Sequence, residues 1–390
     1  MNEALAGFVT LICLATCWVL WREARFQAAG WKAGDAARNA AIASAYIAMG
    51  AAAASAAYRL YFLLSGIPDV LEAGRVADAG QLALSIVFLV LISGGAQLIE
   101  RAARGVSLFV VDRRLQLNNA SLAMFSADTA KAMAVSAAFG VPLAAGWIWL
   151  MEAGITYWWV AAWALWFAIL TVRMLVKPQI ETMLFSKAHD LPEGALRSRL
   201  EGLLDRCGIR THSMSVIEAS KRTNRVNASV NGLGAHKRIF LYDTLLDALN
   251  AGEVEAVLAH EAGHVRHRHL GLAWAGLGLL GLAGAYAIAK AVTGAQWAPA
   301  QTVAIVLAVF PSALLLLRPL LVGISRRFEF QADAYAAKQC GPTAIQDALR
   351  KIFAANHGVW EHHWAFAAVF AGHPSGRERI ERLQELLPSA

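Results

Sequence analysis

The sequence predicts an all-α membrane bundle of seven transmembrane helices that carries a cytoplasmic α+β domain. Of the 390 residues, 57% are hydrophobic and only 16% are charged, which is too few charges for an ordinary soluble protein. The hydrophobic residues also gather into seven runs that approach or exceed the roughly 20 residues needed to cross about 30 Å of hydrocarbon. These runs are residues 4–21, 40–64, 80–98, 130–151, 155–176, 270–294 and 298–322.

The basic residues alternate between the two sides of this bundle. Lys and Arg gather after the first, third and fifth runs, whereas the opposite connections carry only Arg75 and Lys290. Basic connections stay in the cytoplasm, so we expect the N-terminus outside and the C-terminus inside. The net charge of +7 therefore reflects membrane topology. No basic and aromatic pattern predicts nucleic-acid binding, and the expected surroundings are the lipid bilayer.

The first run is predicted to be a retained anchor, because no basic residue precedes it as in a signal peptide. The four cysteines have neither the spacing of a disulfide framework nor that of a metal knuckle, and we expect free thiols. They are Cys13, Cys17, Cys207 and Cys340.

Two arginines lie inside the apolar runs, where a guanidinium facing lipid is costly. We expect Arg59 to face the interior of the bundle. Arg318 is expected to snorkel to the interface or to find a partner close to Pro311 and Pro319, two prolines that should bend the last span.

The long connection 177–268 has the pattern of a small α+β unit. A helix is predicted from the Leu191 to Gly194 segment to about Cys207, and another after Asn250, where Glu253 is spaced as a capping-box partner. Extended segments are expected at residues 214–218, 226–230 and 237–242.

The helix after Asn250 contains His260-Glu261-Ala262-Gly263-His264. Histidines four residues apart project from one helix face, so His260 and His264 can bind the same Zn²⁺. Glu261 then lies beside the open coordination position, where it can act as a general base. The pentapeptide alone is a suggestive signal, since chance produces it in roughly one chain per hundred of this composition.

A catalytic zinc takes a third protein ligand, and residues 326–333 offer one. Glu329 and Asp333 are one helical turn apart, which suits a ligating carboxylate followed by a carboxylate that orients a ligating histidine. The alternative is an ordinary acidic pair that balances Arg326 and Arg327 beside the membrane.

Several segments of the C-terminal half, taken together, resemble the type I CAAX prenyl endopeptidases, which are seven-span zinc metalloproteases that trim prenylated C-termini. The segments are Leu191–Gly194, Ser220–Arg222, Asn227–Ala228 with Gly232, Lys237–Leu246, His260–His264 with His269, Ser325–Asp333, and His373–Pro374 with Arg379. The span count extends the similarity over most of the chain.

The resemblance implies one Zn²⁺ per chain held by His260, His264 and Glu329, catalysis by Glu261 and support by Asp333. It implies a gluzincin-like α+β zinc metalloprotease domain, with an active site facing a water-filled chamber enclosed by the spans. We expect four segments. They are 1–176 with the first five helices, 177–268 as the cytoplasmic catalytic segment, 269–322 with the sixth and seventh helices, and 323–390 as the cytoplasmic segment that completes the zinc site.

Substrate contacts are expected from Asn227, Ala228 and Arg379, with residues 226–230 as an edge strand to which a peptide can add. His373 precedes a proline and, by the resemblance, reaches the developing oxyanion as a second catalytic residue. Ser229 departs from the family pattern, which has an aromatic residue there, so the side-chain preference for substrates is left open.

The remaining histidines are assigned no chemistry. His267 and His269 are expected to form a solvated or interfacial basic turn. His362 and His363 are expected to serve packing or the surface rather than a second metal site.

The predicted function is hydrolysis of peptide bonds near the C-terminus of prenylated, CAAX-type or other membrane-associated peptides by a zinc metalloendopeptidase. One alternative is a membrane quality-control metalloprotease of the HtpX-like kind, which has the same chemistry and unprenylated substrates. A second alternative is a transporter or scaffold with a structural zinc, although structural sites usually have four protein ligands.

Overall fold

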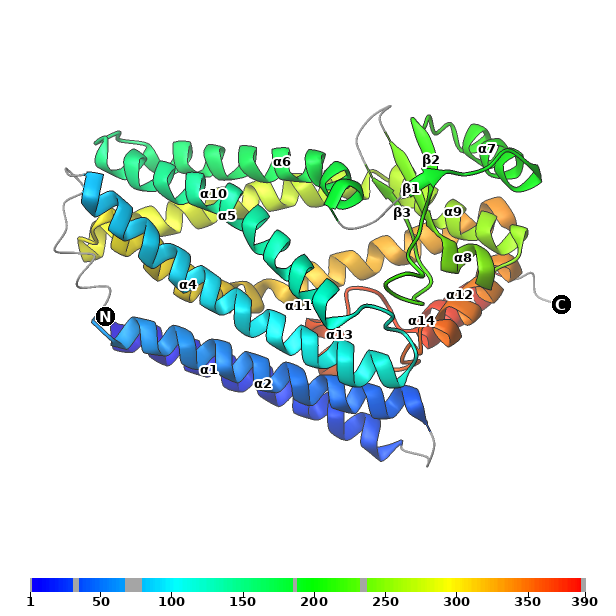
Figure 1. Ribbon diagram of the computed structural model, residues 1–390, viewed down its shortest axis with the longest axis horizontal. Helices are drawn as coiled ribbons and strands as arrows, with labels where there is room; N and C mark the ends of the chain where they lie inside the picture. Colours follow the sequence, from blue (N-terminus) through cyan, green and yellow to red (C-terminus); the bar gives the residue numbers. More distant parts are fainter. Residues whose placement is uncertain (1, 31–34, 67–78, 185–187, 232–236, 387–390) are drawn as a thin grey trace.

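The computed structural model describes residues 2–30, 35–66, 79–184, 188–231 and 237–386. Long helices run along most of the longest axis of the molecule, and a small sheet with its covering helices lies at one end (Figure 1). The N-terminus lies at the opposite end from this α/β part. The two ends of the bundle are therefore different in structure, as the sequence predicts.

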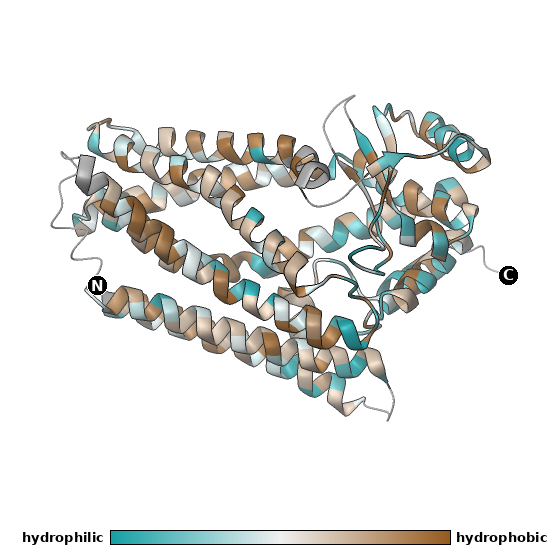
Figure 2. Cartoon of the chain, viewed as in Figure 1, coloured by the Kyte–Doolittle hydropathy of each residue, from teal (hydrophilic) through white to brown (hydrophobic). Residues whose placement is uncertain are grey.

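Seven helices of the described residues are long and apolar enough to cross a membrane, which confirms the predicted span count. They are α1 (Asn2–Ala29), α2 (Ala36–Leu64), α4 (Ala79–Val106) with the π-helical η1 (Ser107–Asp112), α5 (Leu122–Glu152), α6 (Trp158–Leu184), α10 (His269–Ala295) and α11 (Pro299–Cys340). Hydrophobic residues dominate these helices, whereas hydrophilic residues are concentrated in the α/β part (Figure 2). Large side chains such as Leu279 and Leu320 are well exposed, as expected for a surface that faces lipid.

The α/β part is built on a four-stranded sheet of order β1-β2-β4-β3. Its strands are β1 (Ala188–Asp190), β2 (Ser213–Ile217), β3 (Ala228–Asn231) and β4 (Arg238–Tyr242). β4 pairs in parallel with β2 and antiparallel with β3. The three predicted extended segments are confirmed, β1 is an additional strand, and β3 is an edge strand as expected.

Among the described residues, five shorter helices complete this part: α7 (Ala195–Cys207), α8 (Asp243–Ala248), α9 (Ala251–Arg266), α12 (Pro342–Ala355) and α14 (Gly376–Gln384). A further short helix, α13 (Trp364–Val369), packs on α1 and α11. A single apolar core joins side chains from α7, β2, β4, α9 and α12, including Leu203, Leu241 and Leu258. Burial of such side chains away from water is the main force that fixes α9 against the sheet.

The predicted capping box at the start of α9 is confirmed. The Asn250 side chain accepts a hydrogen bond from the Glu253 N–H at 3.0 Å, and the Glu253 carboxylate accepts one from the Asn250 N–H at 2.9 Å. Lys351 of α12 also donates to this carboxylate. The first turn of α9 is therefore fixed in position and satisfied in hydrogen bonding.

Helix α11 is continuous through Pro311 and Pro319 and leads from the membrane helices into the α/β part. It changes direction along its length, as the two prolines predict (Figure 1). The same helix is thus both the last span and a wall of the α/β part, where it packs closely on α9.

The contact between α9 and α11 depends on Gly263. A Cβ atom at this position would lie 2.9 Å from the Ala332 Cα and 3.2 Å from the Ala332 carbonyl oxygen. Both are main-chain atoms, so neither can move without shifting α11. A glycine here is therefore required by the close approach of the two helices.

We expect Gly263→Ala to push α9 and α11 apart and to destabilise the protein by about 1–3 kcal/mol, the usual cost of overpacking. Thermal unfolding of the purified protein measures the effect. Gly252→Ala is the matched control in the same helix, because the atom nearest to its added Cβ is 3.4 Å away. An unfolding temperature for Gly263→Ala equal to that of the control would contradict this account.

Candidate metal centre

The contact between α9 and α11 brings His260, His264 and Glu329 together. His260 Nε2 lies 3.5 Å from Glu329 Oε2, and His264 Nε2 lies 3.5 Å from Glu329 Oε1. The two Nε2 atoms are 3.2 Å apart, and the three residues can each offer one ligand atom within 4.8 Å of the others. The sequence predicted the same three residues as ligands.

The donor atoms at this position fit a Zn²⁺ ion. Glu329 Oε2 is buried and has no hydrogen-bond partner among the described residues, although His373 Nδ1 lies 2.9 Å away. A buried carboxylate oxygen requires a partner, and a cation between the carboxylate and the two imidazoles would provide one. Two imidazoles and one carboxylate are also a usual ligand set of catalytic zinc.

The electrostatics of the two histidines also favour a cation. Burial lowers the pKa of His264 to about 4, with a further contribution from His260, so its ring is neutral in the form that binds metal. Burial alone would lower the pKa of His260, yet the neighbouring carboxylates of Asp333 and Glu329 raise it to about 9. The carboxylates therefore create a negative potential that stabilises positive charge between the helices.

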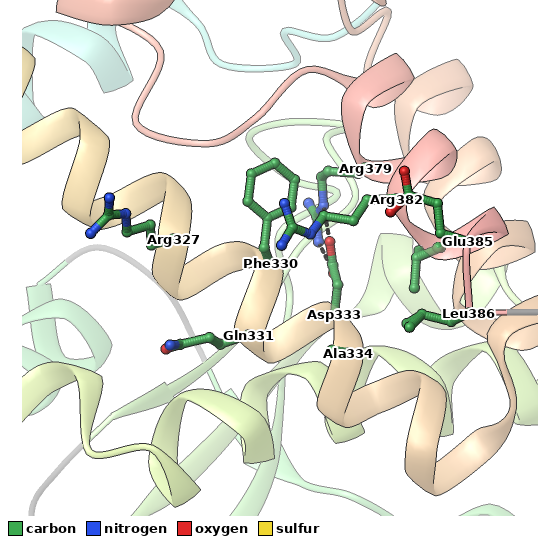
Figure 3. Close-up of a pocket in the computed structure, with 10 residues that line it drawn as sticks. Arg327, Phe330, Gln331, Asp333, Ala334, Arg379, Arg382, Glu385 and Leu386 are labelled. Carbon is green, nitrogen blue, oxygen red and sulfur yellow. Dashed lines mark hydrogen bonds and ion pairs between the residues drawn. The ribbon is translucent and has the colours of Figure 1, made fainter.

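Asp333 lies behind the ligands and orients one of them. Its Oδ1 is 2.9 Å from His260 Nδ1, so the other ring nitrogen, Nε2, faces Glu329. Arg379 reaches from α14 and donates from Nε to Asp333 Oδ2 at 2.8 Å (Figure 3). Because Arg379 is buried in this contact, its position favours an orienting role over the substrate contact expected from the sequence.

A cavity of about 580 Å³ opens on the far side of this pair, between α11 and α14 (Figure 3). Arg327 and Arg382 line it, and Arg382 lies over the Phe330 ring. None of the three candidate ligands contributes to its lining, so this cavity is distinct from the candidate metal centre.

His269 is the residue at this centre whose role was predicted wrongly. It is only 3% exposed rather than part of a solvated turn, and its ring stacks on Phe328. Its Nδ1 lies 2.9 Å from His264 Nδ1 and its Nε2 lies 2.8 Å from Gln331 Oε1. Arg268, with φ of 56°, reverses the chain between α9 and α10 and folds His269 back onto His264. His267 is exposed, as predicted.

Glu261 lies between the ligands and the edge of the sheet. Burial raises the pKa of its carboxyl, and the main-chain N–H of Val230 in β3 donates to it. The β3 segment therefore runs beside the candidate metal centre. The Asn227 side chain is turned back onto its own strand, where Oδ1 accepts from the Ala228 N–H at 2.9 Å.

His373 reaches the centre from the loop between α13 and α14. The loop is held by Ser375, which caps α14 with Glu378, and by an ion pair between Glu378 and Arg326 of α11. The His373 side chain is 75% exposed although its Nδ1 is close to Glu329. It is thus accessible from outside the ligand cluster.

The other histidine pair has a packing role, as predicted. His362 Nδ1 lies 2.8 Å from the Glu23 carboxylate of α1, and the His363 N–H donates to the same group at 2.8 Å. These contacts join the C-terminal segment to the first span.

Comparison with known proteins gives two family matches in the order of the chain. Residues 32–187 match the model of the CAAX prenyl protease N-terminal domain with five membrane helices, and residues 190–387 match the model of peptidase family M48. The matched regions include the first membrane helices after α1 and all of the candidate ligands.

Similar proteins share this arrangement. A CAAX prenyl protease 1 homolog of Arabidopsis thaliana is 29% identical over 77% of this chain and 73% of its own. The Homo sapiens homolog is 26% identical over 84% of this chain and 80% of its own. The crystal structure of S. mikatae Ste24p has the same fold, with a TM-score of 0.84, 98% coverage of both chains and 21% identity.

The seven spans, the histidine and glutamate cluster and both family matches all indicate the same kind of protein, a metalloprotease within a membrane. A five-helix membrane domain preceding the peptidase region also favours this group over metalloproteases with fewer spans. The chain belongs to peptidase family M48 and is an integral membrane zinc metalloprotease.

Proposed function

We propose that this chain hydrolyses peptide bonds near the C-terminus of prenylated, CAAX-type peptides at the cytoplasmic side of a membrane. The observation that carries the proposal is the position of Glu261, between the His260, His264 and Glu329 cluster and the open edge of the sheet. The names of the relatives, CAAX prenyl protease 1 homologs, support the substrate class.

The topology in this proposal has the N-terminus outside and the active site and C-terminus in the cytoplasm. The asymmetry of Lys and Arg supports it, because the basic connections lie on the side of residues 177–268. In this arrangement 1–176 and 269–322 are the membrane segments, and 177–268 and 323–390 together form the gluzincin-like catalytic domain.

A Zn²⁺ ion held by His260, His264 and Glu329 would supply Lewis acidity and lower the pKa of the attacking water toward about 7. Glu261 accepts the proton of that water on its carboxylate and passes it to the departing amine nitrogen. Its raised pKa brings the carboxyl nearer to the value at which it both takes and returns a proton.

The substrate is held as an additional strand on β3. Asn227 accepts the Tyr242 N–H, so in this antiparallel pair residues 227, 229 and 231 bond to β4. The main-chain groups of Ala228 and Val230 then face the open edge, where their carbonyls can accept N–H groups of a bound peptide. His373, accessible beside Glu329, donates to the carbonyl oxygen as negative charge develops on it.

The number of protein ligands distinguishes a catalytic zinc from the structural zinc of a transporter or scaffold. A structural zinc would use four protein ligands, and three are brought together among the described residues, which leaves a position for water. The remaining competitor is a membrane protease for unprenylated peptides, which uses the same residues.

Peptides ending in a Cys-aliphatic-aliphatic-X box, farnesylated and bare, distinguish these functions when incubated with the purified, zinc-loaded protein. Cleavage confined to the farnesylated peptide supports prenyl-directed proteolysis. Equal cleavage of both supports general membrane proteolysis, and cleavage of neither by a protein that contains zinc contradicts the proposed substrate class.

Glu261→Gln is expected to lower kcat by at least about 100-fold, since it removes the proton acceptor, while the protein still binds one zinc. His264→Ala is the companion variant and should lose both activity and metal. Peptide cleavage and elemental analysis of zinc are the two measurements. An active Glu261→Gln protein would falsify the assignment of the general base.

Asp333→Asn is expected to weaken zinc binding or activity by about 10- to 100-fold, because His260 loses the carboxylate that orients its ring and Arg379 loses its buried partner. Zinc affinity is measured by competition with a chelator. Asp347→Asn on the exposed face of α12 is the control and should leave the affinity unchanged. Equal affinities of the two variants would remove Asp333 from the support of the metal.

A further inference from the structure

Arg318 lies in the last membrane helix and has not been accounted for by the mechanism. Its guanidinium stacks on the Phe370 ring with its carbon 5.0 Å from the ring centroid, and the residue is half-buried. Phe370 follows α13, which packs between α11 and α1. The side chain is therefore directed into the protein rather than only snorkelling to the lipid interface.

The charge of Arg318 has no ion-pair partner among the carboxylates of the described residues. Three other arginines of the C-terminal half are ion-paired, Arg326 with Glu378, Arg379 with Asp333 and Arg377 with Glu361 and Glu381. An arginine within a span that is stacked on an aromatic ring and lacks an anionic partner is expected to serve a ligand.

The position of Arg318 relates it to the catalytic residues. It precedes Glu329 by eleven residues, which is about three helical turns, so the two side chains project from the same side of α11 about 16 Å apart along the axis. Phe370, beneath the guanidinium, is three residues before His373. Arg318 thus contacts the segment of chain that leads to His373, whose Nδ1 lies beside Glu329.

An unpaired guanidinium inside a membrane span selects an anionic ligand. A guanidinium binds a carboxylate through two parallel hydrogen bonds. A free C-terminal carboxylate is the anion that every such substrate carries at that end.

We propose that Arg318 binds the C-terminal carboxylate of the substrate. This inference rests on the proposed function and adds to it a residue that determines specificity. Phe370 holds the guanidinium in place from below through a cation–π contact. A substrate with a neutral C-terminus then loses this interaction and nothing else.

Two farnesylated peptides ending in Cys-Val-Ile-Ala test the proposal, one with a free carboxylate and one with a carboxamide. The zinc-loaded, full-length protein should cleave the acid with kcat/KM about 10- to 100-fold higher than the amide, mainly through KM. Arg318→Gln should cleave both at the rate of the amide, and this unchanged amide rate shows that the variant is folded. Arg318→Lys should retain part of the preference.

Arg327→Gln is the matched control, because Arg327 is on another face of α11 and should leave the acid preference intact. The inference is overturned if the wild-type protein cleaves acid and amide equally or if Arg318→Gln retains the preference. Neither result affects the proposed function, which fails separately if the wild type cleaves neither peptide.

Binding provides a readout that does not require turnover. In the Glu261→Gln background, a fluorescent form of the acid peptide should bind about 10- to 100-fold more tightly than the amide, and Arg318→Gln should abolish the difference. Equal affinity of both peptides for the Glu261→Gln protein overturns the inference even if no cleavage is observed.

Discussion

The close contact between α9 and α11 is the constraint on which the rest of this structure depends. α9 belongs to the segment between the fifth and sixth spans, whereas Glu329 and Asp333 are on the extension of the last span. Gly263 allows the two main chains to approach until His260 and His264 face Glu329. A wider separation would leave two histidines on one helix and a carboxylate on another, with no common position for a metal.

The polar groups around this contact are satisfied by two series of hydrogen-bonded side chains. His260 bonds to Asp333, which bonds to Arg379, and His264 contacts His269, which bonds to Gln331. Buried groups of this kind are costly when they lack partners and rigid when they have them. These hydrogen bonds therefore fix the orientation of the His260 and His264 imidazoles before any ligand binds. Metal catalysis needs such preorganised ligands.

The membrane helices support the centre as well as anchoring it. Glu23 of α1 binds the segment of His362 and His363, which leads to the loop of His373. Asn356 at the end of α12 donates to the Val226 carbonyl and accepts the Val226 N–H, directly before β3. The loop that carries His373 and the edge strand are thus each tied to elements distant in sequence, so their positions follow from the whole fold.

The sequence alone determined the features that depend on local composition and spacing. The seven apolar runs, the capping box of α9, and the pairing of His260 with His264 on one helix face all follow from hydrophobicity and helical period. The spacing of Glu329 and Asp333 suited a third ligand, and the family resemblance singled out Glu329, which lies beside both histidines. Tertiary structure alone decided which side chains meet across elements. It buried His269 against His264, turned Arg379 onto Asp333, and placed Arg318 over Phe370. The environment of such residues is set by neighbours many positions away in the chain, and no local pattern of residue types encodes that proximity.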